Sequence, residues 1–415
     1  MFKSVFLFTL ASLFLFFEMA LQVSPGIMTR DLMRSLDIDI FWLGMTSGAY
    51  FITYTLMQIP AGLIYDRFSV RNGILLPLLA CIIGGFLFAI APNFYLAACA
   101  RIFMGCGSAF AFIGVLVVAS HVFPERYFSF SAGVAQMLAA MGAMCGTIPL
   151  IPLTENFGWR ITMFIMSSFG VFLFIIMCFF LKLPNQKTTA IPIRSSSIFI
   201  TIAKQSQTWL IAVYACLLWM PMAVVASLYG VPFLEKYFNL TFSNAAIIIT
   251  FMWVGIAVGS PVAGFITDKT QKLKSALIIT ALIGAIAFYL ILFGGFNKIG
   301  ILILLFFAAG SSCSGQVLSF SLVSKNNNSE HRATAIGFNN MAVVISGFIF
   351  QPLVGFIIRY SEKSKEVIYN YSAQSYFNGM LIVLLGYTIA IIVVIVFIKS
   401  PIFSLPRKEL IMRKD

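Results

Sequence analysis

Charged residues are scarce in this sequence. Only 10% of its 415 residues are Asp, Glu, Lys or Arg, against about 25% in soluble domains. Apolar types supply 60% of the chain, which excludes an ordinary soluble globular protein. Apolar runs of about 20 residues, enough to cross roughly 30 Å of hydrocarbon, recur with short polar interruptions. The bilayer is therefore the main solvent, and no stretch remains for a soluble domain.

Groups that bind metals or perform catalysis are equally scarce. The two histidines, His121 and His331, lie at predicted loop edges, and the seven cysteines fall in apolar segments without paired spacing. This pattern argues against disulfides, a metal site and any cofactor. No His-Glu-x-x-His or Gly-x-Ser-x-Gly motif supports a membrane enzyme. A receptor is disfavoured because no signalling domain is present.

The apolar runs predict an all-α membrane protein. They are too long for barrel strands, and a helical bundle satisfies the backbone in lipid. The first run, although it follows Lys3 as a signal peptide would, is too long for one and lacks a small-x-small cleavage site. The twelve predicted helices cover residues 5–29, 41–65, 73–93, 95–120, 128–153, 160–182, 208–232, 243–267, 275–295, 299–323, 333–358 and 378–399.

The basic residues give the orientation. With the N-terminus inside, most of the 27 Lys and Arg residues fall in cytoplasmic segments, as the positive-inside rule requires. We expect a bacterial inner-membrane protein with both termini in the cytoplasm. The net charge of +13 then reflects topology and contact with anionic lipid, so it predicts no nucleic-acid partner.

The longest cytoplasmic connection lies near the middle of the chain. It contains basic and serine residues, two prolines and no acid, which is typical of a linker. The predicted organisation is a six-helix bundle over 1–183, a linker over 184–207, a second six-helix bundle over 208–399 and a tail over 400–415.

A short motif repeats in the two predicted bundles. The pattern Gly-x-x-x-Asp-basic comprises Gly62, Asp66 and Arg67, and again Gly264, Asp268 and Lys269. A second pair agrees, since Glu125-Arg126 precedes the fifth helix and His331-Arg332 the eleventh. Two tandem six-helix halves are the parallel repeat of transporters that work by alternating access.

These motifs resemble those of the major facilitator superfamily over essentially the whole chain. Its loop signature, Gly-x-x-x-Asp-Arg-x-Gly-Arg-Arg/Lys, is matched by Gly62, Asp66, Arg67 and Arg71, and departs at Ser69 and Val70. Its helix-four signature, Arg-x-x-x-Gly-x-Gly, is matched by Arg101, Gly105 and Gly107, and the start of helix six at 158–160 is also similar. The resemblance implies two pseudo-symmetric bundles and a monomeric transporter.

A closer resemblance is to the phagosomal nutrient transporters (Pht family) of intracellular bacteria. It rests on residues 18–25, on Tyr50 to Tyr54 with 58–60, and on 107–114. Members take up amino acids or nucleosides, and relatives handle siderophores. Gln22 stands where a basic residue often follows the helix-one glutamate. The resemblance implies uptake of a small polar nutrient.

Glu18 and Arg101 are the only acid and the only cation placed inside the hydrocarbon. A charge there costs at least about 2.5–3.5 kcal/mol, so each needs a partner or a water-filled cavity. In the superfamily fold helices one and four line the cavity, so the two could meet there. They form either a proton-coupling pair, in which Arg101 holds Glu18 or an anionic substrate group, or a static pair that fixes helix packing.

Polar side chains near this pair are candidates for substrate binding. Gln22 lies one turn beyond Glu18, and Tyr50, Tyr54 and Gln58 form an i, i+4, i+8 stripe on helix two. Weaker candidates are Gln136, Trp219, Gln316, Asn339 and Asn340. Tyrosines that anchor helices and hydrogen bonds between helices are the alternatives.

The repeated loop motif predicts a gate. Asp66 and Arg67 are assigned to the inner gate by the resemblance, and Asp268 and Lys269 mirror them. The alternative is a solvated helix end. Gly142 and Gly146 form a small-xxx-small face in helix five, where drug/proton antiporters carry a Gly-Pro motif that is missing here. Import is therefore favoured over export, with a proton-coupled exporter of drugs or siderophores as the alternative.

Overall fold

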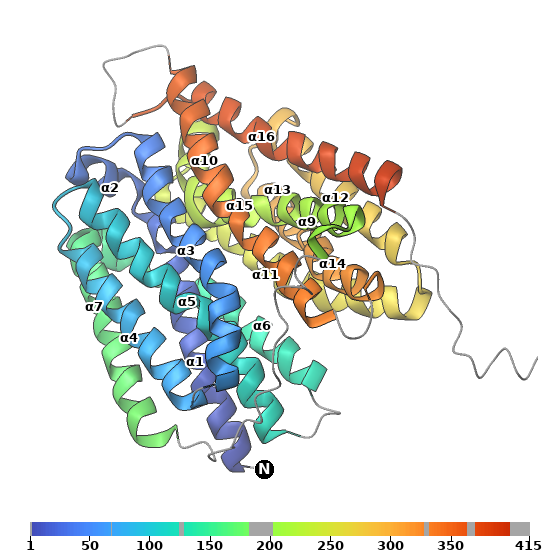
Figure 1. Ribbon diagram of the computed structural model, residues 1–415. Helices are drawn as coiled ribbons and strands as arrows, with labels where there is room; N and C mark the ends of the chain where they lie inside the picture. Colours follow the sequence, from blue (N-terminus) through green and yellow to red (C-terminus); the bar gives the residue numbers. More distant parts are fainter. Residues whose placement is uncertain are drawn as a thin grey trace, which may run out of the picture.

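The computed structural model describes residues 2–67, 69–123, 128–181, 202–327, 332–362 and 370–398. The described residues form helices and connecting turns and contain no strand. Figure 1 shows the helices gathered in two groups, in blue to green and in yellow-green to red. We call them the N-terminal helices and the C-terminal helices.

The N-terminal helices are α1 (Phe2–Val23), η1 (Ser24–Ile27), α2 (Thr29–Leu36), α3 (Ile40–Arg67), α4 (Val70–Ala89), α5 (Phe94–Val122), α6 (Phe128–Cys145) and α7 (Leu150–Phe180). Helix α1 packs against α5 and α6, and α4 lies between α5 and α7. Helix α3 contacts α5 on one side and α15 of the second group on the other. It therefore forms much of the boundary between the groups.

The C-terminal helices are α9 (Ser206–Pro221), η3 (Met222–Tyr229), α10 (Gly230–Tyr237), α11 (Phe242–Thr270), α12 (Leu273–Phe293), α13 (Ile299–Ser312), α14 (Ser314–Lys325), α15 (Arg332–Ser361), α16 (Ala373–Ile392) and η5 (Val393–Phe397). Helix α11 packs on α13, α12 lies against α13 and α16, and α9 contacts α15. The two groups meet mainly where α15 crosses α3, and also between α6 and α11.

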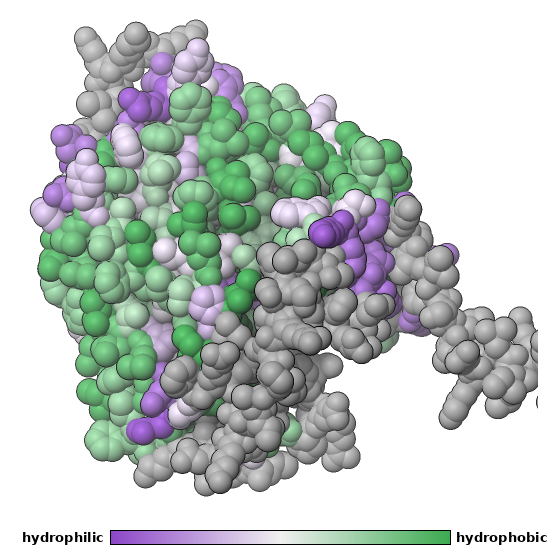
Figure 2. Space-filling model, in the orientation of Figure 1, coloured by the Kyte–Doolittle hydropathy of each residue, from purple (hydrophilic) through white to green (hydrophobic). Residues whose placement is uncertain are grey.

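Ten stretches of the described residues are long and apolar enough to cross a membrane. Helices α3 and α6 lie where the other two of the twelve predicted spans were expected, over 41–65 and 128–153. Figure 2 shows a broad apolar surface on the sides of the molecule, with hydrophilic residues gathered near its ends. On α7, Phe172 is 60% and Phe179 67% exposed, as side chains that face lipid should be.

The helix ends differ from the prediction where the chain bends. The fifth predicted helix stops at Cys145, because Gly146 begins a turn and Pro149 precedes α7. Helix α7 is itself kinked at Gly158, whose φ of 76° favours glycine. After Pro221 the backbone follows a π-helix to Tyr229. Hydropathy does not detect such breaks, since all these residues suit a membrane interior.

Two predicted parts of the chain lie largely or wholly outside the described residues. Most of the linker over 184–207 and the whole tail over 400–415 belong to them. The loop pairs at 125–126 and at 331 do as well. The division into two six-helix bundles, with boundaries at the linker over 184–207 and the tail over 400–415, therefore remains a prediction.

Glycines bring helices into close contact. A Cβ at Gly142 would lie 2.3 Å from the carbonyl oxygen of Phe16, and one at Gly146 would lie 2.6 Å from that of Ala20. The small-xxx-small face therefore packs on α1, as predicted. On α13, a Cβ at Gly310 would lie 2.0 Å from the carbonyl oxygen of Met252 in α11.

Gly310→Ala should destabilise the protein by about 1–3 kcal/mol, because α11 and α13 would have to move apart. The matched control on the same helix is Gly300→Ala, whose added methyl group would meet no atom within 4 Å. The melting temperature in detergent should fall for Gly310→Ala and should be unchanged or slightly raised for Gly300→Ala. Equal melting temperatures of the two variants would contradict the close packing.

Candidate functional site

The site begins where α1 ends. In a regular helix the carbonyl of Leu21 would accept from the N–H of residue 25, but residue 25 is proline and has no N–H. The guanidinium of Arg101, on α5, donates instead to the Leu21 oxygen at 3.0 Å and to the Gln22 oxygen at 3.3 Å. Ser24 Oγ adds a bond to Leu21 at 3.1 Å. Arg101 thus caps α1, as basic groups do at helix C-termini.

Glu18 lies one turn earlier on α1 and has hydroxyl partners. Its Oε2 accepts from the Tyr50 hydroxyl at 2.7 Å, and the Ser108 hydroxyl is within hydrogen-bonding reach. The carboxyl group is only 1% exposed. In the part of the chain that the structure describes, no ion pair joins Glu18 to Arg101.

Tyr50 separates the two charged groups. Its hydroxyl contacts Glu18, while the Arg101 guanidinium carbon lies 4.5 Å from its ring centroid. A desolvated cation over an aromatic face gains about 2 kcal/mol. Arg101, itself 1% exposed, is therefore stabilised by two carbonyls and a ring, and the negative charge of Glu18 is not needed to hold it.

The predicted polar stripe on α3 forms as expected. The rings of Tyr50 and Tyr54 lie 5.9 Å apart, and Tyr54 is in hydrogen-bond contact with Gln58. Gln58 Oε1 accepts from Asn340 Nδ2 on α15 at 3.1 Å. The stripe therefore runs from the buried carboxyl group to a contact between the two groups of helices.

The remaining candidates are dispersed. Gln22 is buried beside Glu18, and Gln136 is half-buried on α6. Trp219, on α9, contacts the ring of Trp253. Gln316 is buried on α14. Asn339, on α15, donates from its Nδ2 to Ser319 Oγ on α14 at 2.7 Å. Asn339 therefore bonds within the C-terminal helices, whereas Asn340 reaches across to α3.

The gating motif is described only in part. The side chains of Asp66, Arg67 and Asp268 lie outside the described residues, and Lys269 is exposed. Arg71 donates to the carbonyl oxygen of Cys178 in the last turn of α7 at 2.5 Å. This bond links the start of α4 to the end of α7, in the same way that the bonds of Arg101 link α5 to α1.

Contacts that the sequence did not predict close the end of the molecule at which α2 lies, which we call the α2 end. Ion pairs join Arg30 to Glu235 at 3.4 Å and Arg359 to Asp39 at 3.0 Å. Each links the N-terminal to the C-terminal helices. In sequence these residues were only loop charges, and no spacing identified their partners.

Two tyrosines reinforce the α2 end. The Tyr229 hydroxyl donates to the carbonyl oxygens of Gln351 at 2.8 Å and Ile40 at 3.2 Å. The Tyr371 hydroxyl accepts from the Ile40 amide at 3.3 Å. Burial raises the pKa of Tyr371, so it remains a neutral phenol at physiological pH.

Comparison with known proteins identifies the family. The sequence profile of the Major Facilitator Superfamily matches residues 7–351. The chain belongs to this superfamily. It is therefore a multi-pass membrane protein of a transporter superfamily, and the predicted superfamily is confirmed.

The chain is similar to several fungal transporters. The chain is 27% identical over 164 residues to the MFS-type transporter VdtG of Byssochlamys spectabilis, covering 40% of this chain and 29% of that protein. It is 27% identical over 152 residues to the Aspyridones efflux protein of Neocamarosporium betae, covering 36% and 26%. The match thus spans little more than a quarter of the length of these relatives.

Solved structures share the fold. A bacterial homologue of the human lysosomal transporter Spinster, inward-facing and unoccupied, superposes with a TM-score of 0.78 at 14% identity, over 94% of this chain and 96% of that one. A mutant of the nucleoside transporter NupG superposes with a TM-score of 0.77 at 13% identity, over 95% and 100%. At this identity the likeness concerns the fold.

Replacing Glu18 and Arg101 separately should affect stability unequally. Arg101→Gln loses charge-assisted bonds to two carbonyls and should lower the free energy of unfolding by about 2 kcal/mol or more. Glu18→Gln breaks no ion pair and should change it by less than about 1 kcal/mol. Thermal unfolding in detergent measures both, and Arg101→Lys, which keeps only the charge, should be intermediate. A loss for Glu18→Gln as large as that for Arg101→Gln would indicate a true charge pair.

Proposed function

We propose that this protein is a proton-coupled secondary transporter that works by alternating access, with Glu18 as the residue that binds and releases the proton. The observation that supports this role is the buried carboxyl group, which has hydroxyl partners and forms no ion pair with any residue that the structure describes. An ionised carboxylate in such a place costs several kcal/mol, whereas a neutral carboxylic acid costs far less. In this conformation Glu18 therefore carries the proton.

Movement of the C-terminal end of α1 would change the free energy needed to ionise Glu18. Glu18 lies one turn from Leu21 and Gln22, whose carbonyls are bound by Arg101. If α1 shifts against α5 during transport, water or the guanidinium can reach the carboxylate and stabilise its charged form. Proton release is then tied to helix movement, which is the requirement for coupling.

The contacts between the two groups of helices support alternating access. The α2 end is held closed by the two ion pairs and by the hydrogen bonds of Tyr229 and Tyr371 to the backbone of Ile40. Further along the facing stripes, Gln58 and Asn340 still touch. One turn beyond, Gly62 and Gly337 have no neighbouring atom within 4 Å of where a Cβ would lie. Helices α3 and α15 therefore separate towards the end that holds the N-terminus.

The predicted topology indicates which end of the molecule faces each side of the membrane. With both termini cytoplasmic in a bacterial inner membrane, the α2 end faces outward and the separated end faces inward. The structure then corresponds to a transporter closed to the outside, and the gating loop at Gly62 and Gly264 lies on the open side. We propose a monomer, twelve spans in two six-helix halves, and contact with anionic lipid through the cytoplasmic basic residues.

Uptake of a small nutrient, such as an amino acid or nucleoside, is the first candidate for the transport reaction. The missing Gly-Pro motif at Gly142 to Gly146 supports uptake. Proton-coupled efflux of drugs or siderophores is the second candidate, and the efflux function named for curated relatives favours it. Accumulation in proteoliposomes under opposite pH gradients separates the two.

Glu18→Gln should abolish accumulation driven by a pH gradient while retaining exchange of substrate across the membrane, because the amide cannot release a proton. The substrate for this assay is found first by a thermal-shift screen of amino acids, nucleosides and siderophores. Ligand at about 100 times its Kd stabilises the protein by about 2.7 kcal/mol. Glu155→Gln, which makes the same change at an exposed glutamate on α7, is the control and should still accumulate substrate. Full accumulation by Glu18→Gln would exclude coupling through this residue.

Tyr229→Phe should open the α2 end. It loses the hydrogen bond to Ile40 that joins the two groups of helices, which contributes about 0.5–1.5 kcal/mol, so the open population should rise about two- to tenfold. Spin labels at residues 95 and 299, which are exposed on opposite groups, should report a longer distance. The control is Tyr237→Phe, whose hydroxyl donates within the C-terminal helices to Leu292. The same distance distribution for both variants would contradict the role of Tyr229.

A further inference from the structure

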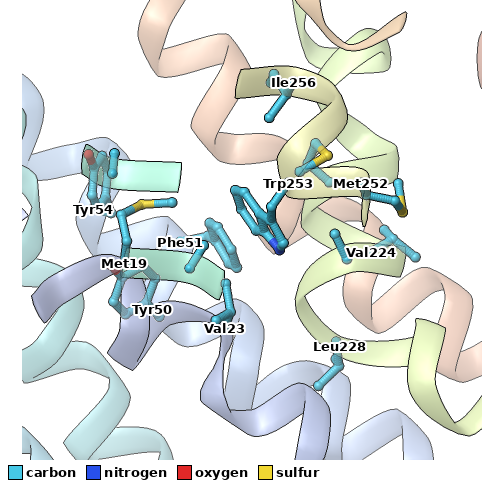
Figure 3. Close-up of a cluster of buried hydrophobic side chains, with 14 of the residues drawn as sticks. Met19, Val23, Tyr50, Phe51, Tyr54, Val224, Leu228, Met252, Trp253 and Ile256 are labelled. Carbon is cyan, nitrogen blue, oxygen red and sulfur yellow. The ribbon is translucent and has the colours of Figure 1, made fainter. Parts of the chain in front are cut away.

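An apolar cluster lies where the two groups of helices face each other. Figure 3 shows side chains from α1 and α3 on one side and from η3 and α11 on the other. We define the facing cluster as Met19, Val23, Phe51, Val224, Met252 and Trp253, all of which are buried. None of these six side chains carries a charge, so the cluster suits a neutral solute.

Trp253 is the only one of the six side chains with a strong hydrogen-bond donor. Its indole is 1% exposed, and its Nε1 has no hydrogen-bond partner among the residues that the structure describes. Figure 3 shows the ring extending from α11 towards Phe51, with the nitrogen on the edge turned away from Ile256. A buried N–H without a partner is costly. A ligand that accepts a hydrogen bond from the Trp253 N–H would remove this cost.

The surroundings of this N–H favour a flat ring as the ligand. Trp219 lies edge-on to Trp253, with centroids 6.5 Å apart at 74°, and aromatic faces bind other rings in stacked or edge-on geometry. Met19 and Met252 line the same cluster. Methionine is flexible and polarisable, so these side chains can move aside to admit a planar solute.

The opposite wall is held in place. The ring of Phe51 packs on α15, where a Cβ at Gly347 would lie 2.4 Å from it. Phe51 also contacts Tyr50 edge-on at 5.3 Å, which in turn donates to Glu18. A solute between Phe51 and Trp253 would therefore lie next to the residue that we assign to the proton.

We propose that Trp253 is a specificity-determining binding residue, and that the transported solute is a neutral, flat aromatic or heteroaromatic compound with a hydrogen-bond acceptor on its ring edge. This proposal rests on the proposed transport function and names its substrate class. The N–H of Trp253 donates to the acceptor, while Phe51 and the two methionines cover the faces of the ring.

Quinoline and indole test the proposal as a matched pair of probes. Both are flat, fused and neutral at pH 7, but quinoline has an acceptor nitrogen whereas indole has only a donor N–H. Equilibrium dialysis against the purified protein in nanodiscs, with empty nanodiscs subtracted, gives the two dissociation constants. Quinoline should bind about fivefold more tightly, the discrimination that one neutral hydrogen bond supports.

Trp253→Phe keeps a ring and removes the N–H, so the preference for quinoline should fall to less than about twofold. Trp209→Phe, which makes the same change at an exposed residue of α9, is the matched control and should keep the preference. Melting temperatures of both variants show that each is folded. The proposal is overturned if the wild type binds neither probe, if it binds both equally, or if Trp253→Phe retains the preference.

Glu18→Gln separates this proposal from the proposed function. The quinoline preference is measured in Trp253→Phe and proton-driven accumulation in Glu18→Gln, so each proposal has its own variant and its own readout. Loss of the preference in Trp253→Phe together with full accumulation by Glu18→Gln would refute proton coupling and leave the binding residue established. If Trp253→Phe keeps the preference while Glu18→Gln loses accumulation, the role of Trp253 is refuted and proton coupling through Glu18 is supported.

Discussion

The capping of α1 by Arg101 is the interaction on which the rest of the site depends. Pro25 removes the amide that would bind Leu21, and the guanidinium takes its place. The same side chain lies over the ring of Tyr50, whose hydroxyl is thereby directed to Glu18. One proline directly after α1 thus explains why an arginine is tolerated in an apolar interior, and among the described residues Glu18 forms no ion pair.

The residue types of the site could be predicted from sequence, but their partners could not. Charge in an apolar run identified Glu18 and Arg101, and helical spacing placed Tyr50, Tyr54 and Gln58 on one face. The acceptors for Arg101 are backbone carbonyls, which every residue has and which no sequence pattern distinguishes. The bond between Gln58 and Asn340 depends on how two distant helices cross, and spacing along one chain does not contain that information.

The fold shows the same division. Hydropathy gives ten of the spans because transfer into lipid depends on composition averaged over a helix. It does not give the turn before Pro149, the kink at Gly158 or the π-helix after Pro221. These bends depend on single residues with special backbone geometry. They also decide which side chains of α7 and η3 face the rest of the molecule.

The contact between α3 and α15 has an energetic consequence. These helices touch from Asp39 and Arg359 as far as Gln58 and Asn340, a length of about 28 Å at 1.5 Å per residue, and separate only over the last turns. Opening the α2 end breaks this long seam, whereas closing the other end requires only a short new one. In the transport cycle that we propose, this difference in contact length favours the orientation with the α2 end closed, and binding of solute or proton offsets it.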